Sequence, residues 1–284
     1  MDEPVESTAH PKSVIEVRGF QKSYDGTVAV AGIDLDLAAG QILGLVGPNG
    51  AGKTTTLRAI CGIIPPTRGR LLVAGHSIAD DPVNAKRRLA YVPDDPRLFD
   101  TLTVCEHLEF MASAYNVPDL AMLGPTLLDQ FELTPKRDTL AQELSRGMRQ
   151  KVAICCAFLH DPLAILLDEP LTGLDPRGIR EMKDAIRRRA EAGAGVIISS
   201  HLLSIVEDLC THLFVLHRGR RVFTGPMHEA RAMLGESAAG LSLEEIFFRL
   251  TEGEPPVVDG ADGAPLVTEP GDGPPPPGAG ARAP

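Results

Sequence analysis

The sequence has no apolar run long enough to cross a membrane. Its longest apolar stretches, VAICCAFL (152–159) and PLAILL (162–167), are far shorter than the ~20 residues that a membrane-spanning helix needs. The N-terminal MDEPVESTAHPKS is acidic and polar, and it lacks the basic and then apolar pattern of a signal peptide. The sequence therefore predicts a cytoplasmic protein that is not secreted and has no membrane span.

Positive charge and patterned cysteines are also scarce. The 28 Lys and Arg residues are outnumbered by 38 Asp and Glu residues, for a net charge of −10. Because nucleic-acid binding needs clustered Lys and Arg against the phosphates, we expect no nucleic-acid partner. The five cysteines follow neither metal-site nor disulfide spacing, so they are predicted to be free thiols. Cys155, Cys156 and Cys210 stand in apolar helical runs, which favours buried side chains.

What the chain does contain is an alternation of strand and helix patterns. Short alternating runs between Val14 and Leu37 predict antiparallel strands with a turn at Asp25 and Gly26. Strands then alternate with helices, which predicts an α/β fold with a mainly parallel sheet, interrupted by a helical subdomain at about residues 95–160. The predicted strands are 41–47, 70–75, 162–170 and 195–200, the predicted helices are 53–62, 103–116 and 176–193, and a hairpin turns at Gly219.

The two ends of the chain have a different composition. Residues 1–13 are predicted to be a disordered lead. Residues 251–284, which end in GDGPPPPGAGARAP, are rich in Pro, Gly and acidic residues and poor in large apolar side chains, so they are predicted to be a disordered tail. The folded domain is expected to span residues 14–250, with a helix at 241–250 as its last element.

A phosphate-binding loop is predicted at GPNGAGKTT, Gly47–Thr55. It fits the G-x-x-x-x-G-K-[ST] pattern, follows an apolar strand and opens a helix. Its glycines let the backbone turn successive N–H groups toward phosphates, Lys53 would reach the β- and γ-phosphates, and Thr54 would ligand Mg²⁺. A glycine-rich turn with a surface lysine is the alternative. The predicted nucleotide-binding residues here are Gly47, Pro48, Asn49, Gly50, Ala51, Gly52, Lys53, Thr54 and Thr55.

Two acidic residues end a later apolar strand, LAILLDE. Asp168 would be a rigid holder of a metal-bound water. Glu169 comes one residue later and could accept a proton from an attacking water. The alternative is a solvated strand end followed by a helix cap. With a phosphate loop upstream, the pair favours a catalytic site for phosphoryl transfer.

A second anion-binding helix start is predicted in LSRGMRQ, Leu144–Gln150, far downstream of the phosphate loop. Ser145 supplies a hydroxyl and Gly147 an unhindered backbone N–H where a helix begins, and helix starts bind anions well. We call Leu144–Gln150 the signature segment. A single phosphate loop can bind a nucleotide without a second anion-binding helix start, so these residues alone do not explain the signature segment.

Taken together, these residues resemble the nucleotide-binding subunits of ATP-binding cassette (ABC) transporters over about residues 14–250. GPNGAGKTT is similar to that family's Walker A loop, LSRGMRQ to its signature, LAILLDEP to Walker B, TGLDP to its D-loop and SSHLL to its switch-histidine segment. The resemblance implies a P-loop NTPase core with an N-terminal antiparallel β subdomain. It also implies that Tyr24 stacks on adenine, with a core aromatic as the alternative. His201 is implied to contact the γ-phosphate and hold Glu169 and the water, with a helix cap or a buried histidine as the alternative.

The family resemblance gives the signature segment a purpose. Two cassettes pack head to tail in this family, so Ser145 and Gly147 of one copy would close over the ATP held by the other. The implied partners are a second copy of the chain, with a homodimer favoured, and separate membrane-spanning permease subunits at the cytoplasmic face of the membrane. YVPDDPRLFDTLTVCEHLEF and SLEEIFFRL are similar to single-cassette exporters of the multidrug and antibiotic efflux type. The helical block after Asp94 is expected to receive the permease's coupling helix.

The sequence departs from the family pattern at two places. The usual signature is LSGGQ, whereas this chain has Arg146 and Met148 at the third and fifth positions. Asp94 stands where the family generally has a Gln that touches Mg²⁺, although the adjacent Asp95 leaves that alignment open by one residue. An Asp there either ligands Mg²⁺ or stays outside its first shell.

Two other functions fit part of the pattern. A cassette ATPase that acts on ribosomes or DNA is one, but such relatives carry two cassettes or a long coiled-coil insertion, and neither is present in this sequence. A regulatory nucleotide binder with negligible turnover is the other, and the presence of both Glu169 and His201 argues against it. The preferred hypothesis is an ATPase with ATP and Mg²⁺ as cofactors that powers export.

Overall fold

The computed structural model describes residues 13–232 and 242–252. Most of the predicted lead and tail lies outside these residues. Ser13, assigned to the lead, is already in a strand, and Thr251 and Glu252, assigned to the tail, complete the last helix. No helix of the described ranges combines the length and apolar character needed to cross a bilayer.

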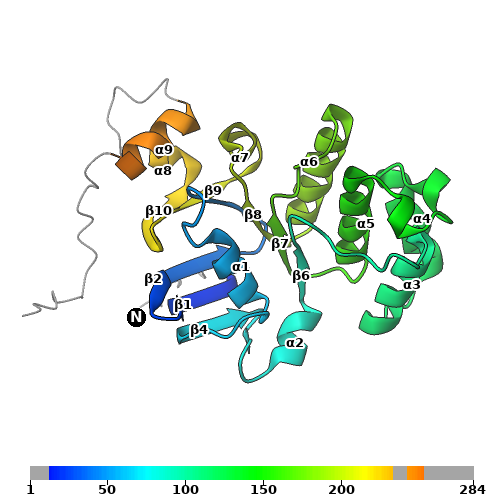
Figure 1. The fold of residues 1–284 in the computed structure, drawn as a ribbon, viewed down its shortest axis with the longest axis horizontal. Helices are drawn as coiled ribbons and strands as arrows, with labels where there is room; N and C mark the ends of the chain where they lie inside the picture. The colour runs from blue at the N-terminus through cyan, green and yellow to red at the C-terminus, as the bar shows by residue number, and fades with distance from the viewer. Residues whose placement is uncertain (1–12, 233–241, 253–284) are drawn as a thin grey trace, which may run out of the picture.

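An antiparallel sheet forms the N-terminal part of the molecule (Figure 1). Its order is β2-β1-β4-β5. The backbone of Asp25 and Gly26 turns between the first two strands with φ of 46° and 84°, which suits a two-residue hairpin and confirms the predicted turn. The strands are β1 (Ser13–Tyr24), β2 (Thr27–Ala38), β4 (Arg68–Val73) and β5 (His76–Ser77).

A second, mainly parallel sheet has the order β10-β9-β3-β8-β7-β6. All of its neighbouring strands are parallel except β9 and β10, which form a hairpin at Gly219 as predicted. The carboxyl ends of its parallel strands therefore meet at one edge. The strands are β3 (Ile42–Val46), β6 (Leu89–Val92), β7 (Ala164–Asp168), β8 (Gly195–Ser199), β9 (His212–His217) and β10 (Arg220–Pro226).

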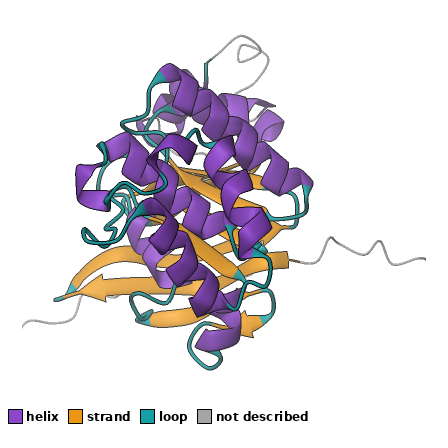
Figure 2. Cartoon of the chain, turned by 90° about the vertical axis from the view of Figure 1, so that its right-hand side faces the viewer, coloured by secondary structure: helices purple, strands orange, loops and turns teal. Residues whose placement is uncertain are grey.

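Helices cover this sheet and form a separate group at the side of the molecule away from the antiparallel sheet (Figures 1 and 2). That group, between β6 and β7, holds α3, α4 and α5 with two short 3₁₀ turns, Thr134–Lys136 and Ala141–Glu143. The α-helices are α1 (Lys53–Ile60), α2 (Pro82–Arg87), α3 (Val104–Tyr115), α4 (Leu120–Gln130), α5 (Arg146–Phe158), α6 (Pro176–Glu191), α7 (Leu203–Leu209), α8 (Met227–Ala232) and α9 (Leu243–Glu252).

Side-chain alternation explains why the central strands read as continuous apolar runs. Leu43 and Leu45 of β3 point into a core shared with the antiparallel sheet and α1. Ile42 and Val46 of the same strand point into the opposite core, which α5 and α6 cover. Both faces are buried, so β3, β7 and β8 are buried along their whole length. The α/β fold class is confirmed.

The cysteines follow their prediction. All five are free, and Cys155 and Cys156 lie buried on α5. Cys210 is buried at the end of α7, against Gly44 of β3. Burial raises the pKa of each of these three thiols, so they stay protonated and behave as small apolar side chains.

Candidate active site

The phosphate loop, Gly47–Thr55, runs from the end of β3 to the first turn of α1. Gly50 and Gly52 have φ of 78° and 107°, a region that side chains with a Cβ rarely adopt. A Cβ on Gly47 would lie 2.4 Å from the carbonyl oxygen of Leu216, so the loop also passes too close to β9 for any larger residue. Because Gly52 caps α1, the free N–H groups of that helix start face the same cavity as the loop.

The hairpin turn between β9 and β10 supports this loop. The Gly219 N–H donates to the Ala51 carbonyl at 3.1 Å, and the Gly219 carbonyl accepts from the Ala31 N–H of β2 at 2.8 Å. A Cβ on Gly219 would lie 2.7 Å from the Ala29 carbonyl oxygen. Gly219 was predicted only as a turn, because its contact with the loop joins residues far apart in the sequence.

Lys53 is buried, with 8% of its surface exposed. Its Nζ donates to the carbonyls of Gly47 at 2.6 Å and Pro48 at 3.2 Å, so the amine folds back over the loop. Burial lowers the pKa of Lys53, while the negative charges of Glu169 and Asp168 act in the opposite direction. A cation that is partly stripped of water and aimed into a cavity is a strong partner for an anion.

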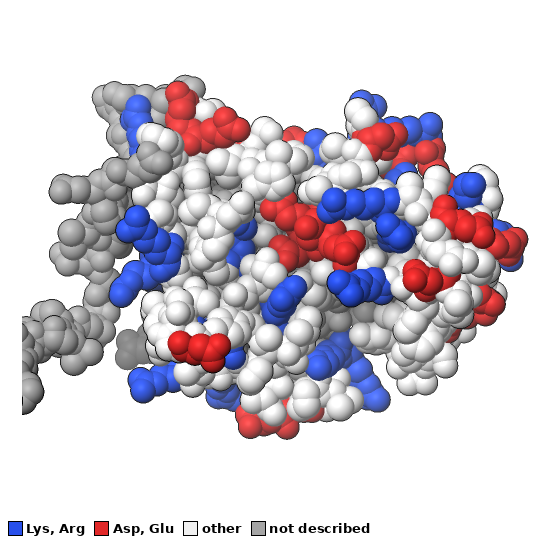
Figure 3. Space-filling model, in the orientation of Figure 1, with Lys and Arg blue, Asp and Glu red and all other residues white. Residues whose placement is uncertain are grey.

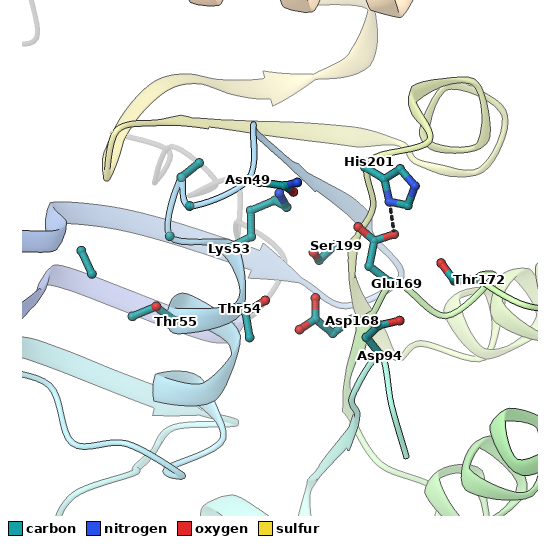
Figure 4. Close-up of a pocket in the computed structure, with 14 residues that line it drawn as sticks. Asn49, Lys53, Thr54, Thr55, Asp94, Asp168, Glu169, Thr172, Ser199 and His201 are labelled. Atoms are coloured by element: carbon teal, nitrogen blue, oxygen red, sulfur yellow. Dashed lines mark ion pairs between the residues drawn. The ribbon is translucent and has the colours of Figure 1, made fainter. Parts of the chain in front are cut away.

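Asp168 and Glu169 stand opposite the loop, at the end of β7 (Figure 4). Asp168 is only 4% exposed and belongs to the strand. Glu169 leaves the strand with a φ of 51°, a left-handed conformation that costs a non-glycine residue about 1 kcal/mol or more. Its N–H donates to the Ser199 carbonyl at 2.9 Å, and this bond to the end of β8 fixes the strained backbone.

The carboxylate of Glu169 is held from the neighbouring strand end. His201 Nδ1 lies 2.8 Å from Glu169 Oε2, and the Ser200 hydroxyl donates to the same oxygen at 3.4 Å. The Glu169 side chain is 16% exposed and the His201 ring 57% exposed. His201 is therefore neither a helix cap nor a buried histidine, and it places a polar ring at the mouth of the cavity beside a fixed carboxylate (Figure 4).

These groups line one cavity of about 510 Å³. Acidic side chains gather near the middle of this face of the molecule, with basic side chains on their flanks (Figure 3). Of the residues predicted for the site, the cavity lining contains Asn49, Gly50, Ala51, Gly52, Lys53, Thr54, Thr55, Asp94, Asp168, Glu169 and His201. It also contains three residues that were not predicted, Ala29, Thr172 and Ser199. Gly47 and Pro48 lie behind the lining as acceptors for Lys53.

Tyr24, predicted to stack on adenine, and Asp94, predicted near Mg²⁺, lie in different surroundings. Tyr24 is 44% exposed at the end of β1, with Lys22 Nζ 4.9 Å from the centre of its ring, and it is not part of the cavity lining. It is not a core residue, so that alternative is wrong, and adenine stacking stays a prediction. Asp94 does line the cavity while Asp95 does not, which favours Asp94 as the residue at the family's Gln position.

The donor set of the cavity fits Mg²⁺. The described residues form no cluster of three or more His, Cys, Asp or Glu side chains that could hold a metal. Mg²⁺ does not need one, since it binds through one or two protein oxygens together with waters and phosphate oxygens. The Thr54 hydroxyl and the Asp168 carboxylate would supply hard oxygen ligands in the same cavity as the phosphate loop.

The signature segment opens α5 in a different place. The Ser145 hydroxyl caps this helix and accepts from the Met148 N–H at 3.2 Å. A Cβ on Gly147 would lie 2.8 Å from the Gly173 carbonyl oxygen, so only glycine lets these two backbones approach. Ser145 and Gly147 line a second cavity of about 320 Å³ that shares no lining residue with the phosphate cavity. Within a single chain, the phosphate loop and the signature segment therefore line two different cavities.

Comparisons with known proteins agree with the geometry. A family model for the ABC transporter matches residues 30–172. The chain is 34% identical to the ABC-type transporter ATP-binding protein EcsA of Bacillus subtilis (strain 168), over 84% of this chain and 97% of that protein. It is 33% identical to the daunorubicin/doxorubicin resistance ATP-binding protein DrrA of Streptomyces peucetius, over 83% and 72%. A solved structure of an ATP binding subunit of an ABC transporter matches with a TM-score of 0.79 at 34% identity, over 84% and 99%.

The support of the loop by Gly219 can be tested with a matched pair of glycines. Gly219→Ala should lower the affinity for ATP about tenfold, because the new methyl group collides with the Ala29 carbonyl and displaces the donor to Ala51. Gly75→Ala is the control, since Gly75, in the turn between β4 and β5, also has a positive φ, 80°, but a Cβ there meets nothing within 4 Å. Binding of a fluorescent ATP analogue measures both variants. Equal losses of affinity would contradict a specific role for Gly219.

Proposed function

The chain belongs to the ABC transporter family, and we propose that it is the ATP-binding and ATP-hydrolysing subunit that powers export through separate membrane-spanning subunits. The observation that carries this proposal is the convergence of Lys53, Asp168, Glu169 and His201 on one cavity beside the phosphate loop. The loop and Lys53 can bind an anion, and Asp168 offers oxygen ligands for a metal. The carboxylate of Glu169 is held by His201. Each part is what phosphoryl transfer to water requires.

ATP binding would use the loop backbone and Lys53. The N–H groups at the start of α1 and the buried ammonium offer positive potential to the β- and γ-phosphates. The Thr54 hydroxyl and Asp168 would hold Mg²⁺, which when bound neutralises part of the phosphate charge. The affinity then comes from groups that are already in place before ATP arrives.

Hydrolysis would depend on Glu169. Its carboxylate would take a proton from a water whose oxygen attacks the γ-phosphorus, and ADP leaves as the bond between the β- and γ-phosphates breaks. The bond from its N–H to Ser199 and the contact with His201 orient the carboxylate, so little motion is needed at the moment of reaction. His201, exposed at the cavity mouth, would contact the γ-phosphate.

Replacing the proposed base separates binding from turnover. Glu169→Gln keeps the size and the hydrogen-bonding oxygen but cannot accept the proton, so ATP binding should persist while turnover falls at least ~100-fold. The ATP-bound dimer should then accumulate, as measured by size-exclusion chromatography with ATP and Mg²⁺. A variant that hydrolyses ATP at the normal rate would sink this role for Glu169. Wild-type protein with negligible turnover would instead favour a regulatory binder.

The separation of the two cavities supports a site shared between two chains. Ser145 and Gly147 line a different cavity from the phosphate loop of their own chain, and the two cavities share no lining residue. Head-to-tail packing of a second copy would bring its signature segment over the bound ATP. Because ATP would contact both copies, it would favour the closed dimer, and hydrolysis would release it.

Mixing two inactive variants tests the shared site. Lys53→Ala removes the phosphate contact of one half, and Ser145→Arg blocks closure from the other half. A mixed dimer contains one composite site with both halves intact, so the mixture should recover measurable ATP hydrolysis although each parent alone is inactive. A mixture as inactive as its parents would count against head-to-tail sites.

We place the membrane partner at a groove beside the helical group. The cavity, of about 260 Å³, lies between the loop after β6 and helices α3 and α5. Phe99 and Phe110 line it with exposed fractions of 54% and 50%, and their rings meet edge to face at 5.3 Å. His107 fixes the loop, since its Nε2 accepts from the Phe99 N–H at 3.0 Å and its Nδ1 lies 2.7 Å from the Thr103 carbonyl.

An exposed aromatic pair suits a coupling helix of a permease, and the groove is lined by Pro93, which directly precedes Asp94 of the phosphate cavity. The chain would then work as a peripheral subunit on the cytoplasmic face of the membrane, most simply as a homodimer. Relatives named for transport and for drug resistance support this proposal, and neither name supports the alternative of a ribosome- or DNA-acting ATPase.

Truncating the exposed rings should weaken association with the permease. Tagged Phe99→Ala and Phe110→Ala proteins, purified from solubilised membranes, should recover the membrane subunits at about one tenth of the wild-type yield or less. Phe248→Ala is the control, because Phe248 is 59% exposed on α9 and does not line the groove. If the tagged wild-type protein sediments with ribosomes rather than membranes, the transport proposal is wrong.

A further inference from the structure

Two of the three residues that depart from the family pattern, Arg146 and Asp94, are in contact with each other. Arg146 Nη2 donates to Asp94 Oδ1 at 2.9 Å, although 52 positions separate them in the sequence. Arg146 is the first residue of α5, and Asp94 follows β6 in the loop that lines the phosphate cavity. Their side chains are about half exposed, at 49% and 50%.

Arg146 also stands between the two cavities. Its neighbours Ser145 and Gly147 line the second cavity, whereas its guanidinium reaches Asp94 in the lining of the first. The stem of the side chain passes over Gly173, where an added Cβ would lie 3.4 Å from Arg146 Cδ. This packing gives the guanidinium a defined direction.

The carboxylate of Asp94 adds negative charge to the cavity in which we propose that a triphosphate binds. The lining already contains the carboxylates of Asp168 and Glu169, and Lys53 is the lysine facing them. A third carboxylate would repel the phosphates, and the repulsion is strong where water is partly excluded. In Figure 4, Asp94 lies on the side of Asp168 and Glu169, across from Lys53 and Thr54.

We propose that Arg146 is a positioning residue for nucleotide binding, which neutralises Asp94 so that this carboxylate stands in the phosphate cavity without repelling ATP. The proposal rests on the proposed function, since it concerns the same nucleotide site. The bond to Arg146 also commits Asp94 to a partner within the chain and leaves it outside the first shell of Mg²⁺. The cation thus reaches the phosphate cavity from the chain's own signature segment.

The exposed position of the pair makes this testable without unfolding the protein. Ion pairs between half-exposed side chains contribute little to folding stability. Their charges still act on a highly charged ligand a short distance away, at low salt above all. Substitutions at either residue are therefore expected to fold, and circular dichroism with a thermal melt verifies this for each variant.

The test is a double-mutant cycle of ATP binding. Wild type, Arg146→Gln, Asp94→Asn and the double variant are titrated with a fluorescent ATP analogue in EDTA, at low salt and at protein concentrations too low for dimer formation. Arg146→Gln should bind about three- to tenfold more weakly, and Asp94→Asn more tightly than wild type, since each exposes one uncompensated charge. The double variant should return to within about twofold of wild type.

Two comparisons separate an electrostatic role from a structural one. Raising the salt from about 50 mM to about 500 mM should reduce the loss caused by Arg146→Gln, because screening weakens the repulsion. Arg177→Gln is the control for removal of an exposed guanidinium. Arg177 pairs with Glu132 and Glu181, and neither of these lines the phosphate cavity. The Arg177→Gln variant should keep its ATP affinity within about twofold of wild type.

A Mg²⁺ titration tests the second half of the proposal. With ATP analogue bound, the half-saturating Mg²⁺ concentration of Asp94→Asn should stay within about twofold of wild type. An increase of about tenfold or more would identify Asp94 as a metal ligand and overturn that half.

The outcomes also distinguish this inference from the proposed function. If Arg146→Gln weakens binding equally with and without Asp94, the two charges are not coupled and the proposal fails while ATP binding stands. If wild-type protein binds no ATP analogue under any of these conditions, the proposed function and this inference fail together.

Discussion

The register of the parallel strands is the constraint on which the site depends. Asp168, the last residue of β7, pairs with Ser199 of β8, and Ser199 pairs with Leu45 of β3. The phosphate loop, the acidic pair and the histidine segment therefore leave the sheet at one level and meet. A slip by one residue would turn every side chain of a strand to the other face. Apolar layers on both faces of the sheet prevent it, so the two cores hold the ends of these strands, and the side chains they carry, in place.

The parts of this arrangement that are local in sequence were predictable. The phosphate loop needs glycines at positive φ and a helix start, and both requirements are written in consecutive residues. Hairpin turns at Asp25–Gly26 and at Gly219 follow from the same local chemistry, and so does the Ser145 cap of α5. The order of strands and helices gave the fold class, because alternation of these elements restricts the sheet to a parallel core.

Contacts between distant segments were not predictable in the same way. The strained φ of Glu169 and its bond to Ser199 require the neighbouring strand, and the support of the loop by Gly219 requires β9 to lie beside β3. Tyr24 is a residue whose surroundings the sequence pattern left open. It ends a strand as expected, and its ring lies exposed beside Lys22 instead of in the core, so that stacking on adenine stays a prediction. Position along the chain does not determine which way such a ring faces.

Arg146 and Asp94 show that the effect of a charged residue depends on the residue that it contacts. Taken singly, Arg146 adds a cation at the signature segment and Asp94 adds an anion in the phosphate cavity. Placed 2.9 Å apart, they cancel each other locally, and each explains why the other is tolerated. Because Asp94 lines the phosphate cavity and Arg146 opens α5, a change of charge in that cavity would alter the electrostatic environment of the first residue of α5. A half-exposed ion pair is weak enough to respond to such a change, which a buried one would resist.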